Sequence, residues 1–160
     1  MAVVFKSNLL KNQKGFTIIE LVIVIVILGL LATLIFPNAS EIINNHRLES
    51  TAKEIVSDLR IAQQRAISKE AAYRVIMNDE SPATNPKNTY FIKEVNGETI
   101  RTVTLPANII FYVSHEFEFS ISGETPNRTI RLVNKSSNKA KYIIIYRTGR
   151  IRISDSPPPS

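Results

Sequence analysis

The residues best suited to chemistry lie in one short stretch near the N-terminus. Gly15 is followed by Phe16, and Glu20 is the only charged residue in an apolar run that ends at Phe36. A carboxylate in so apolar a segment costs on the order of a few kcal/mol, so it usually has a function or a partner. The alternative is that Glu20 marks the membrane edge of a span beginning at Leu21. That span would hold only 16 residues, which is short for a helix that needs about 20.

The rest of the chain offers no catalytic constellation. It contains no cysteine, which excludes disulfides, thiolate metal sites and a cysteine nucleophile. His46 and His115 are far apart and have no metal-ligand spacing. Gly123 and Gly149 stand alone, without the glycine-rich loop that holds phosphate. We therefore expect a non-enzymatic protein with no cofactor and no metal.

The apolar run of residues 16–36 has to be assigned to one kind of element. It is longer than the apolar part of a secretory signal, roughly 7–15 residues, and no small-residue cleavage site follows it. It is too apolar on every side for a core helix, because a domain of about 120 residues cannot surround such a helix. Its length suits a transmembrane helix. The sequence therefore predicts a membrane-inserted helix over 16–36.

The residues around Gly15 resemble the processing site of type IV pilins and pseudopilins. The stretch that carries the resemblance is Lys14-Gly15-Phe16-Thr17-Ile18-Ile19-Glu20-Leu21. The resemblance implies that a prepilin peptidase removes residues 1–15 by cutting after Gly15, and then methylates the new N-terminal Phe16. The leader carries Lys6, Lys11 and Lys14 and no acid, so its charge should hold it on the cytoplasmic face.

The same resemblance gives Glu20 a role in assembly. Cleavage creates an α-amino group that is largely cationic near neutral pH. In an array of subunits, Glu20 of one copy would meet that amine of its neighbour and set the axial register, because paired charges cost less than single ones in an apolar environment. The implied partners are the peptidase, other pilin or pseudopilin subunits, the inner-membrane assembly platform and membrane lipid. The implied location is a single-pass inner-membrane protein whose C-terminal domain lies outside the cytoplasm.

A long amphipathic helix is predicted after the membrane segment, over residues 37–70. Pro37 ends the apolar run, and we expect a kink there rather than the end of the helix. Beyond it, apolar residues are spaced alternately by four and three, the period of one helix face. The stripe covers fewer than three heptads and strand-rich sequence follows, which favours packing on a sheet over a free coiled coil. Its members are Leu48, Ala52, Ile55, Leu59, Ala62 and Ala66.

Residues 71–155 are predicted to form a β-rich head. Asn96-Gly97 separates two extended runs and is a strong hairpin signal, and Thr148-Gly149 predicts a second hairpin. Short strands at close spacing indicate antiparallel sheets beside the helix, an α+β fold. The proline-rich residues 156–160 are expected to be a disordered tail. The expected strands are 73–77, 89–95, 100–105, 109–113, 116–122, 129–133, 141–146 and 150–154.

The head resembles the GspH/FimT group of minor pilins in the helix end 57–67, in 119–125 and around Gly149-Arg150-Ile151. This implies a GspH-like structural subunit of a type II secretion pseudopilus, which serves protein transport, or of a type IV pilus. The alternative is a FimT-like subunit that binds DNA, because residues 121–160 hold eight basic side chains against two acids. The candidate contacts to DNA or an acidic partner are Arg128, Arg131, Lys141, Arg147, Arg150 and Arg152.

Overall fold

The computed structural model describes residues 15–81, 83 and 87–159, without the side chains of residues 33–40. It divides into two units, Met1–Ala39 and Ser40–Ser160, and each is described here by itself. Most of the predicted leader, residues 1–14, lies outside the described part, as does the side chain of Pro37. The leader and the kink at Pro37 therefore stay predictions.

One helix, α1 (Ile18–Lys69), contributes to both units. Its backbone is helical through position 37, so the helix does not end at the proline, and it ends where the sequence predicted. Within the residues described, no helix is long and apolar enough to cross a membrane. The predicted membrane segment 16–36 runs into residues 33–36, whose side chains lie outside the described part.

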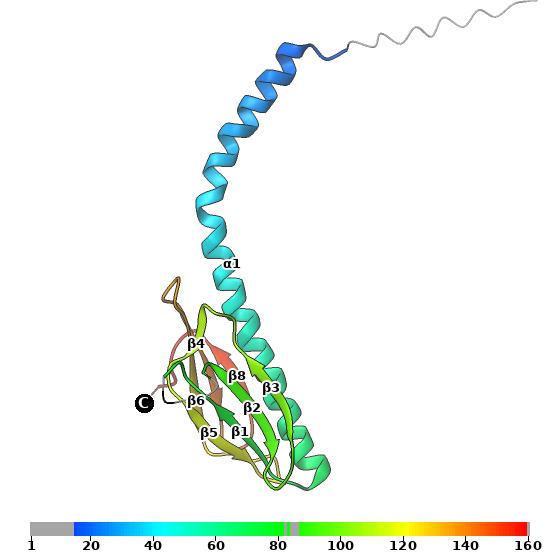
Figure 1. Cartoon of the computed structure of the whole chain (residues 1–160), viewed down its shortest axis with the longest axis vertical. Helices are drawn as coiled ribbons and strands as arrows, with labels where there is room; N and C mark the ends of the chain where they lie inside the picture. The colour runs from blue at the N-terminus through cyan, green and yellow to red at the C-terminus, as the bar shows by residue number, and fades with distance from the viewer. Residues whose placement is uncertain (1–14, 82, 84–86, 160) are drawn as a thin grey trace, which may run out of the picture. The chain divides into compact units, whose positions relative to one another are not determined.

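The second unit holds two four-stranded antiparallel sheets (Figure 1). The strand orders are β3-β2-β1-β5 and β4-β6-β7-β8. This confirms the antiparallel sheets expected from the sequence. The strands are β1 (Tyr73–Met77), β2 (Thr89–Glu94), β3 (Thr99–Thr104), β4 (Ile109–Phe111), β5 (His115–Phe119), β6 (Arg128–Asn134), β7 (Ala140–Ile145) and β8 (Ile151–Ser154).

The chain passes repeatedly from one sheet to the other. It leaves the first sheet after β3, forms β4 in the second, returns for β5 and leaves again for β6. Strand β5 pairs with β1 in the antiparallel register Tyr73↔Phe119 to Met77↔His115. The first sheet therefore combines β1, β2 and β3 with β5, and the second combines β4 with β6, β7 and β8.

Both predicted hairpins are present. Gly97 donates its backbone N–H to the carbonyl of Glu94 at 3.1 Å, which closes the β2–β3 turn. Gly149 donates to the carbonyl of Tyr146 at 2.8 Å and closes the β7–β8 turn. Gly149 has φ +79°, a left-handed conformation that glycine adopts without steric cost. The turns therefore form where the sequence placed them, and no strand end differs from its expected position by more than three residues.

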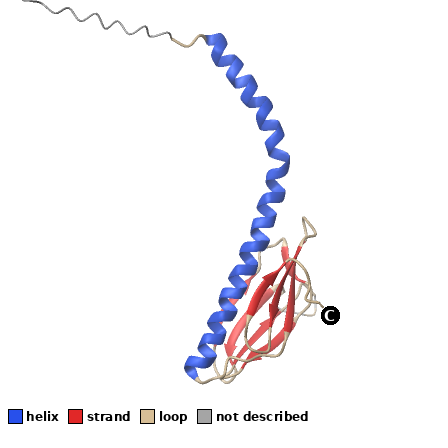
Figure 2. Cartoon of the chain, turned by 180° about the vertical axis from the view of Figure 1, so that it is seen from behind, coloured by secondary structure: helices blue, strands red, loops and turns tan. Residues whose placement is uncertain are grey.

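The core lies between the second half of α1 and the inner faces of both sheets (Figure 2). The predicted helix stripe from Leu48 to Ala66 is buried, each member being at most 2% exposed. It packs with the inward side chains of the strands, of which Tyr90, Phe111 and Phe119 are the largest fully buried aromatics. The buried core cluster extends from Leu48 to Ile151. Because this core lies within Ser40–Ser160, we expect that fragment to fold without residues 1–39.

His115 falls between the expected strands 109–113 and 116–122, which predicts a solvated loop histidine, and the structure shows otherwise. It is the first residue of β5, where it pairs with Met77 of β1. Its side chain is partly buried, and Nε2 is buried without a hydrogen-bond partner among the described residues. The cause is the pairing of β5 with β1, a long-range contact that the residues next to His115 in the sequence do not reveal.

Candidate functional sites

The predicted processing segment begins α1 with a reciprocal hydrogen-bond arrangement. The Glu20 backbone N–H donates to Thr17 Oγ1 at 3.2 Å, and the Thr17 backbone N–H donates to Glu20 Oε2 at 3.1 Å. This is a capping box, in which residues at the N-cap and N3 positions satisfy each other's backbone donors. The spacing Thr17-x-x-Glu20 is the signal in the sequence that indicates such a box. Oε1 of Glu20 has no hydrogen-bond partner among the described residues.

The helix that follows presents apolar side chains without a covering layer in the described chain. Phe16 is 89% exposed and Ile18 is 84% exposed. From Ile19 to Leu31 the large apolar side chains are between 48% and 64% exposed. A contiguous apolar surface of this kind marks a site of protein or membrane interaction.

A basic surface with an aromatic centre forms around the β7–β8 turn. The guanidinium carbons of Arg150 and Arg152 each lie 6.0 Å from the ring centroid of Tyr146. Both arginines and Tyr146 are exposed, as are Arg128 and Arg147. We call these five residues the Tyr146 patch. A cation within about 6 Å of an aromatic face is attracted by the ring, so the two arginines flank an exposed π-system.

Local backbone contacts hold this patch in place. Arg147 donates its backbone N–H to Asn127 Oδ1 at 2.6 Å, which connects the turn to the residue before Arg128. Gln63 of α1 donates from Nε2 to the carbonyl of Gly123 at 3.0 Å. A Cβ on Gly149 would lie 1.9 Å from Gln63 Nε2 and 2.4 Å from the Gly123 carbonyl oxygen. The turn therefore packs closely against the last turns of α1, and only glycine leaves room for that contact.

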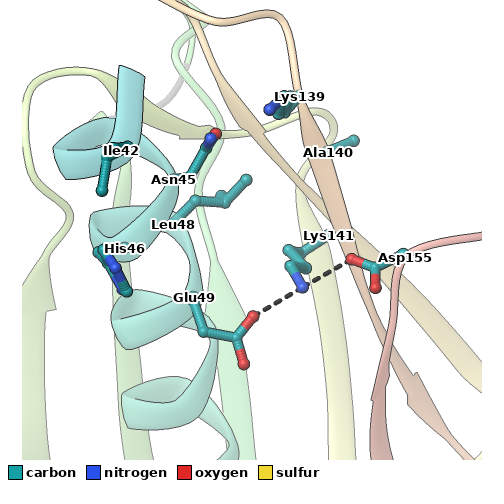
Figure 3. Close-up of a pocket in the computed structure, with 9 residues that line it drawn as sticks. All are labelled: Ile42, Asn45, His46, Leu48, Glu49, Lys139, Ala140, Lys141 and Asp155. Carbon is teal, nitrogen blue, oxygen red and sulfur yellow. Dashed lines mark ion pairs between the residues drawn. The ribbon is translucent and has the colours of Figure 1, made fainter. Parts of the chain in front are cut away.

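Two of the six predicted basic contacts lie apart from this patch. Lys141 is directed into a groove of about 660 Å³ between α1 and β7 (Figure 3). There its Nζ lies 2.7 Å from Glu49 Oε2 and 2.6 Å from Asp155 Oδ1, and these partners raise the pKa of Lys141. Arg131 lies 4.4 Å from the ring centroid of Tyr112, at the β4 side of the sheet. The structure thus places Arg150 and Arg152 beside the Tyr146 ring, with Arg147 in the adjoining turn and Arg128 on the neighbouring strand β6, while Lys141 bridges acids of its own chain.

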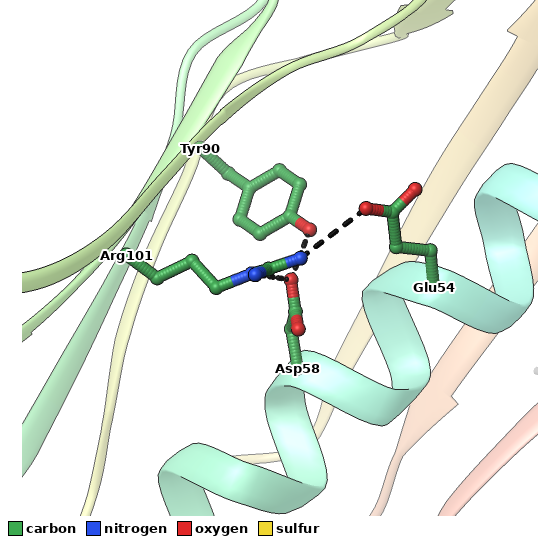
Figure 4. A network of polar contacts seen from close by, with 4 residues as sticks. All are labelled: Glu54, Asp58, Tyr90 and Arg101. Atoms are coloured by element: carbon green, nitrogen blue, oxygen red, sulfur yellow. Dashed lines mark hydrogen bonds and ion pairs between the residues drawn. The ribbon is translucent and has the colours of Figure 1, made fainter.

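A second polar network joins α1 to the other sheet (Figure 4). Asp58 is only 4% exposed, and its Oδ2 accepts hydrogen bonds from the Tyr90 hydroxyl and from Arg101 Nε, both at 2.5 Å. Arg101 Nη2 lies 3.3 Å from Glu54 Oε1. Burial and the neighbouring Asp58 charge raise the pKa of the Tyr90 hydroxyl, so it remains a donor. This network positions β3 on the helix. We find no reactive group in it.

Comparisons with known proteins place these features in a class. Residues 10–36 match the family described as the prokaryotic N-terminal methylation motif. The chain is therefore type IV pilin-like: it joins this motif to an α+β head in which a helix packs on antiparallel sheets.

Solved structures agree with this class. The type IV minor pilin FimU of Pseudomonas aeruginosa is similar with a TM-score of 0.54 and 17% identity, over 69% of this chain and 90% of FimU. The minor pseudopilin EpsH of the type 2 secretion system of Vibrio cholerae has a TM-score of 0.55 and 14% identity, over 68% of this chain and 96% of EpsH. At these identities the likeness shows the fold. No curated protein sequence matches the chain.

Proposed function

We propose that the chain is a structural subunit, a minor pilin or pseudopilin that inserts its N-terminal helix into an assembly of similar subunits. The observation that carries the proposal is the exposed apolar start of the helix, which lies within the methylation motif. This helix has no covering layer in the described chain, whereas the head has a complete core of its own. Burial of apolar side chains against neighbours or lipid would supply the stabilisation that the isolated chain lacks.

Processing would prepare this helix for assembly. Cleavage after Gly15 would create an amine on Phe16, and Glu20 is one helical turn away. Oε2 of Glu20 is occupied by Thr17, and Oε1 is available on an exposed side chain. The same carboxylate can therefore keep the helix cap and accept a charge-assisted hydrogen bond from the amine of a neighbouring subunit.

Coexpression with a prepilin peptidase tests the first step. We expect intact-mass and N-terminal mass spectrometry to show a product that begins at methylated Phe16. An unprocessed or unmethylated product would contradict the proposal. The assembly role of Glu20 is tested separately with Glu20→Ala and Glu20→Gln, which should be processed but should assemble poorly with their partner subunits. Assembly equal to that of the parent would exclude the register role.

The Tyr146 patch supports a second candidate function, binding of DNA. Two exposed arginines, Arg150 and Arg152, flank one exposed aromatic ring, Arg128 and Arg147 are also exposed, and no acid forms an ion pair with any of the four among the described residues. Arginines can hold phosphates, and the ring can stack on a base where the strand is open. A GspH-like role in a secretion pseudopilus requires no such surface. DNA binding would therefore separate the FimT-like role from the GspH-like one.

Fluorescence anisotropy with the fragment Ser40–Ser160 tests DNA binding at about 50 mM salt, where phosphate contacts are strong. We expect affinity to fall steeply as salt rises. The double variant Arg150→Glu, Arg152→Glu should weaken binding by at least about tenfold. Arg65→Glu, which changes an exposed cation of α1 away from the patch, is the matched control. Absence of binding at low salt, or equal loss in the control, would remove this candidate.

A further inference from the structure

A groove beside the last strand of the second sheet differs from both sites described above. It has a volume of about 460 Å³ and lies between α1 and β8. Val56 of α1 and Ile151 of β8 are its most buried apolar members, at 6% and 7% exposed, and Ile153 lies beside them. Lys53, Arg60 and Arg152 are its exposed cations. We call it the α1–β8 groove.

Strand β8 is an edge strand, with β7 on one side only. The Tyr146 N–H donates to the Arg150 carbonyl at 2.9 Å, and the pairing Ile144↔Arg152 continues the same register. Hydrogen-bonded and non-hydrogen-bonded pairs alternate in an antiparallel ladder, so Arg152 exchanges bonds with β7. The N–H and C=O groups of Ile151 and Ile153 therefore face the free edge. No backbone or side-chain group in the described chain bonds to them.

The charged residues of the groove determine which kind of ligand it can bind. Its one acid, Glu49, is already engaged by Lys53 at 3.3 Å and by Lys141 at 2.7 Å. Neither Arg60 nor Arg152 has an ion-pair partner among the described residues. The groove thus has unpaired positive charge along its rim, an apolar floor and a row of open backbone donors and acceptors.

We infer that the α1–β8 groove binds an extended acidic segment of a partner protein, which adds as a strand to β8. Main-chain hydrogen bonds to Ile151 and Ile153 would give affinity, as in other sheet-edge complexes. Side chains alternate along such a strand, so apolar residues would face Val56 while carboxylates on the other side meet Arg152, and Lys53 and Arg60, which flank Val56 on α1, would attract the charge of the peptide along the rim. A nucleic acid could use the cations, but it has no complement for the strand edge or the apolar floor. The peptide therefore accounts for more of the groove.

The test uses the ¹⁵N-labelled fragment Ser40–Ser160 and the synthetic pentapeptide Ac-Glu-Val-Glu-Val-Glu-NH₂ at about 50 mM salt, where exposed charges are weakly screened. We expect saturable shifts of the Ile151 and Ile153 amide signals and slower hydrogen exchange at both. The same peptide with N-methylated valines keeps its charge but cannot donate from those residues. It should bind at least about tenfold more weakly, because net hydrogen bonds contribute about 0.5–1.5 kcal/mol each.

Charge-reversal variants provide a second test of the same inference. Lys53→Glu with Arg60→Glu changes the groove alone and should reduce peptide affinity by about tenfold, the effect expected of two reversed surface charges. Arg150→Glu changes the Tyr146 patch alone, and Arg65→Glu lies outside both surfaces. Both should leave peptide binding within about twofold. The ¹⁵N spectrum of each variant shows whether the fold is kept.

Several results would overturn the inference. These are the absence of saturable shifts, equal binding of the N-methylated peptide, and equal binding of a Lys-Val-Lys-Val-Lys peptide. If single-stranded oligo(dT) shifts Ile151 and Ile153 while the acidic peptide does not, the groove belongs to a nucleic-acid surface and the inference is wrong. Arg152 belongs to both surfaces, so the two proposals are distinguished by Lys53 and Arg60, which line the groove alone, and by Arg150, which belongs to the patch alone.

Discussion

At the scale of single residues, Thr17 and Glu20 form a capping box that is compatible with the assembly contact proposed for Glu20. Their reciprocal hydrogen bonds satisfy two backbone donors at the start of α1, which has no preceding turn to do so. The capping role needs only Oε2 of Glu20. A neighbouring subunit can therefore use the same side chain without unwinding the first turn.

Replacing Thr17 with alanine should loosen this first turn. Loss of an N-cap hydroxyl costs about 1 kcal/mol, which is about fivefold in local opening. The measurement is amide hydrogen exchange of Glu20 and its neighbours in the detergent-solubilised chain. Thr17→Ser retains the hydroxyl and should exchange like the parent. Equal protection in the alanine variant would show that the capping box does not stabilise the helix start.

His115 should make the stability of the head depend on pH. Burial lowers the pKa of His115 below its ordinary value of 6.5, and the Arg128 charge acts in the same direction. Below pH 6.5 the unfolded chain therefore binds a proton that the folded chain does not. The free energy of unfolding should fall as pH drops through this window, by at most about 1.4 kcal/mol per pH unit.

Urea unfolding of the fragment Ser40–Ser160 at about pH 7.5, 6.5 and 5.5 measures this slope. His115→Gln should flatten it, while His46→Gln, which changes an exposed histidine of α1, should keep it. An unchanged slope in the His115 variant would assign the pH dependence to other groups.

At the scale of elements, Arg101 explains a charge arrangement that looked unfavourable in the sequence. Glu54 and Asp58 are like charges four residues apart on α1, a spacing that normally destabilises a helix. In the fold, the guanidinium of Arg101 from β3 bonds to both of them. The helix repulsion is thus offset by a long-range contact that also holds the edge strand β3.

Removing the buried acid should cost far more than removing the exposed one. Asp58→Ala leaves the buried Tyr90 hydroxyl without its acceptor and Arg101 without its closest partner. We expect a loss of about 2–4 kcal/mol in the free energy of unfolding. Glu54→Ala, at an exposed position, should cost less than about 1 kcal/mol. Similar costs in urea unfolding would contradict the importance of burial here.

Local sequence patterns predicted the buried helix face and the two hairpins, but they did not predict which distant strands pair. The apolar period from Leu48 to Ala66 predicted the buried helix face, and Asn96-Gly97 and Thr148-Gly149 predicted both hairpins, because these signals depend on neighbouring residues. Nothing local indicated that β5 returns to β1. For this reason His115 was misjudged, and the pairing of Lys141 with Glu49 and Asp155 was not foreseen.

The candidate sites also divide into those that adjacent residues predicted and those that depend on long-range contacts. The processing motif was readable because its residues are adjacent in sequence. The arginines of the Tyr146 patch were named in advance, and Arg150 and Arg152 do share a face. The position of Tyr146 beside these arginines was not predicted, although Tyr146 stands only two residues before Thr148 in the sequence. The α1–β8 groove could not be predicted, because it combines a helix face with a strand edge about 100 residues away.

At the scale of the whole molecule, the chain combines two parts with different surface properties. The helix start exposes apolar side chains, whereas the head buries its core. We expect the fragment Ser40–Ser160 to be a soluble monomer by sedimentation velocity. The full chain should require detergent to remain dispersed, because its apolar helix otherwise associates with lipid or with other copies. A full chain that is monomeric without detergent would contradict the proposed assembly helix.

The alternation of the chain between the two sheets has a consequence for how the head folds. The first sheet is completed only after the chain has crossed twice between the sheets, and the second only after a third crossing, so the sheets should lack independent stability and unfold in one cooperative transition. The β1–β5 pairing also closes a long loop, which raises the contact order and slows folding. Native-state hydrogen exchange should therefore give the same largest opening free energy for amides of β1 and β7. A head built in this way arrives at its place of assembly either folded throughout or not folded at all.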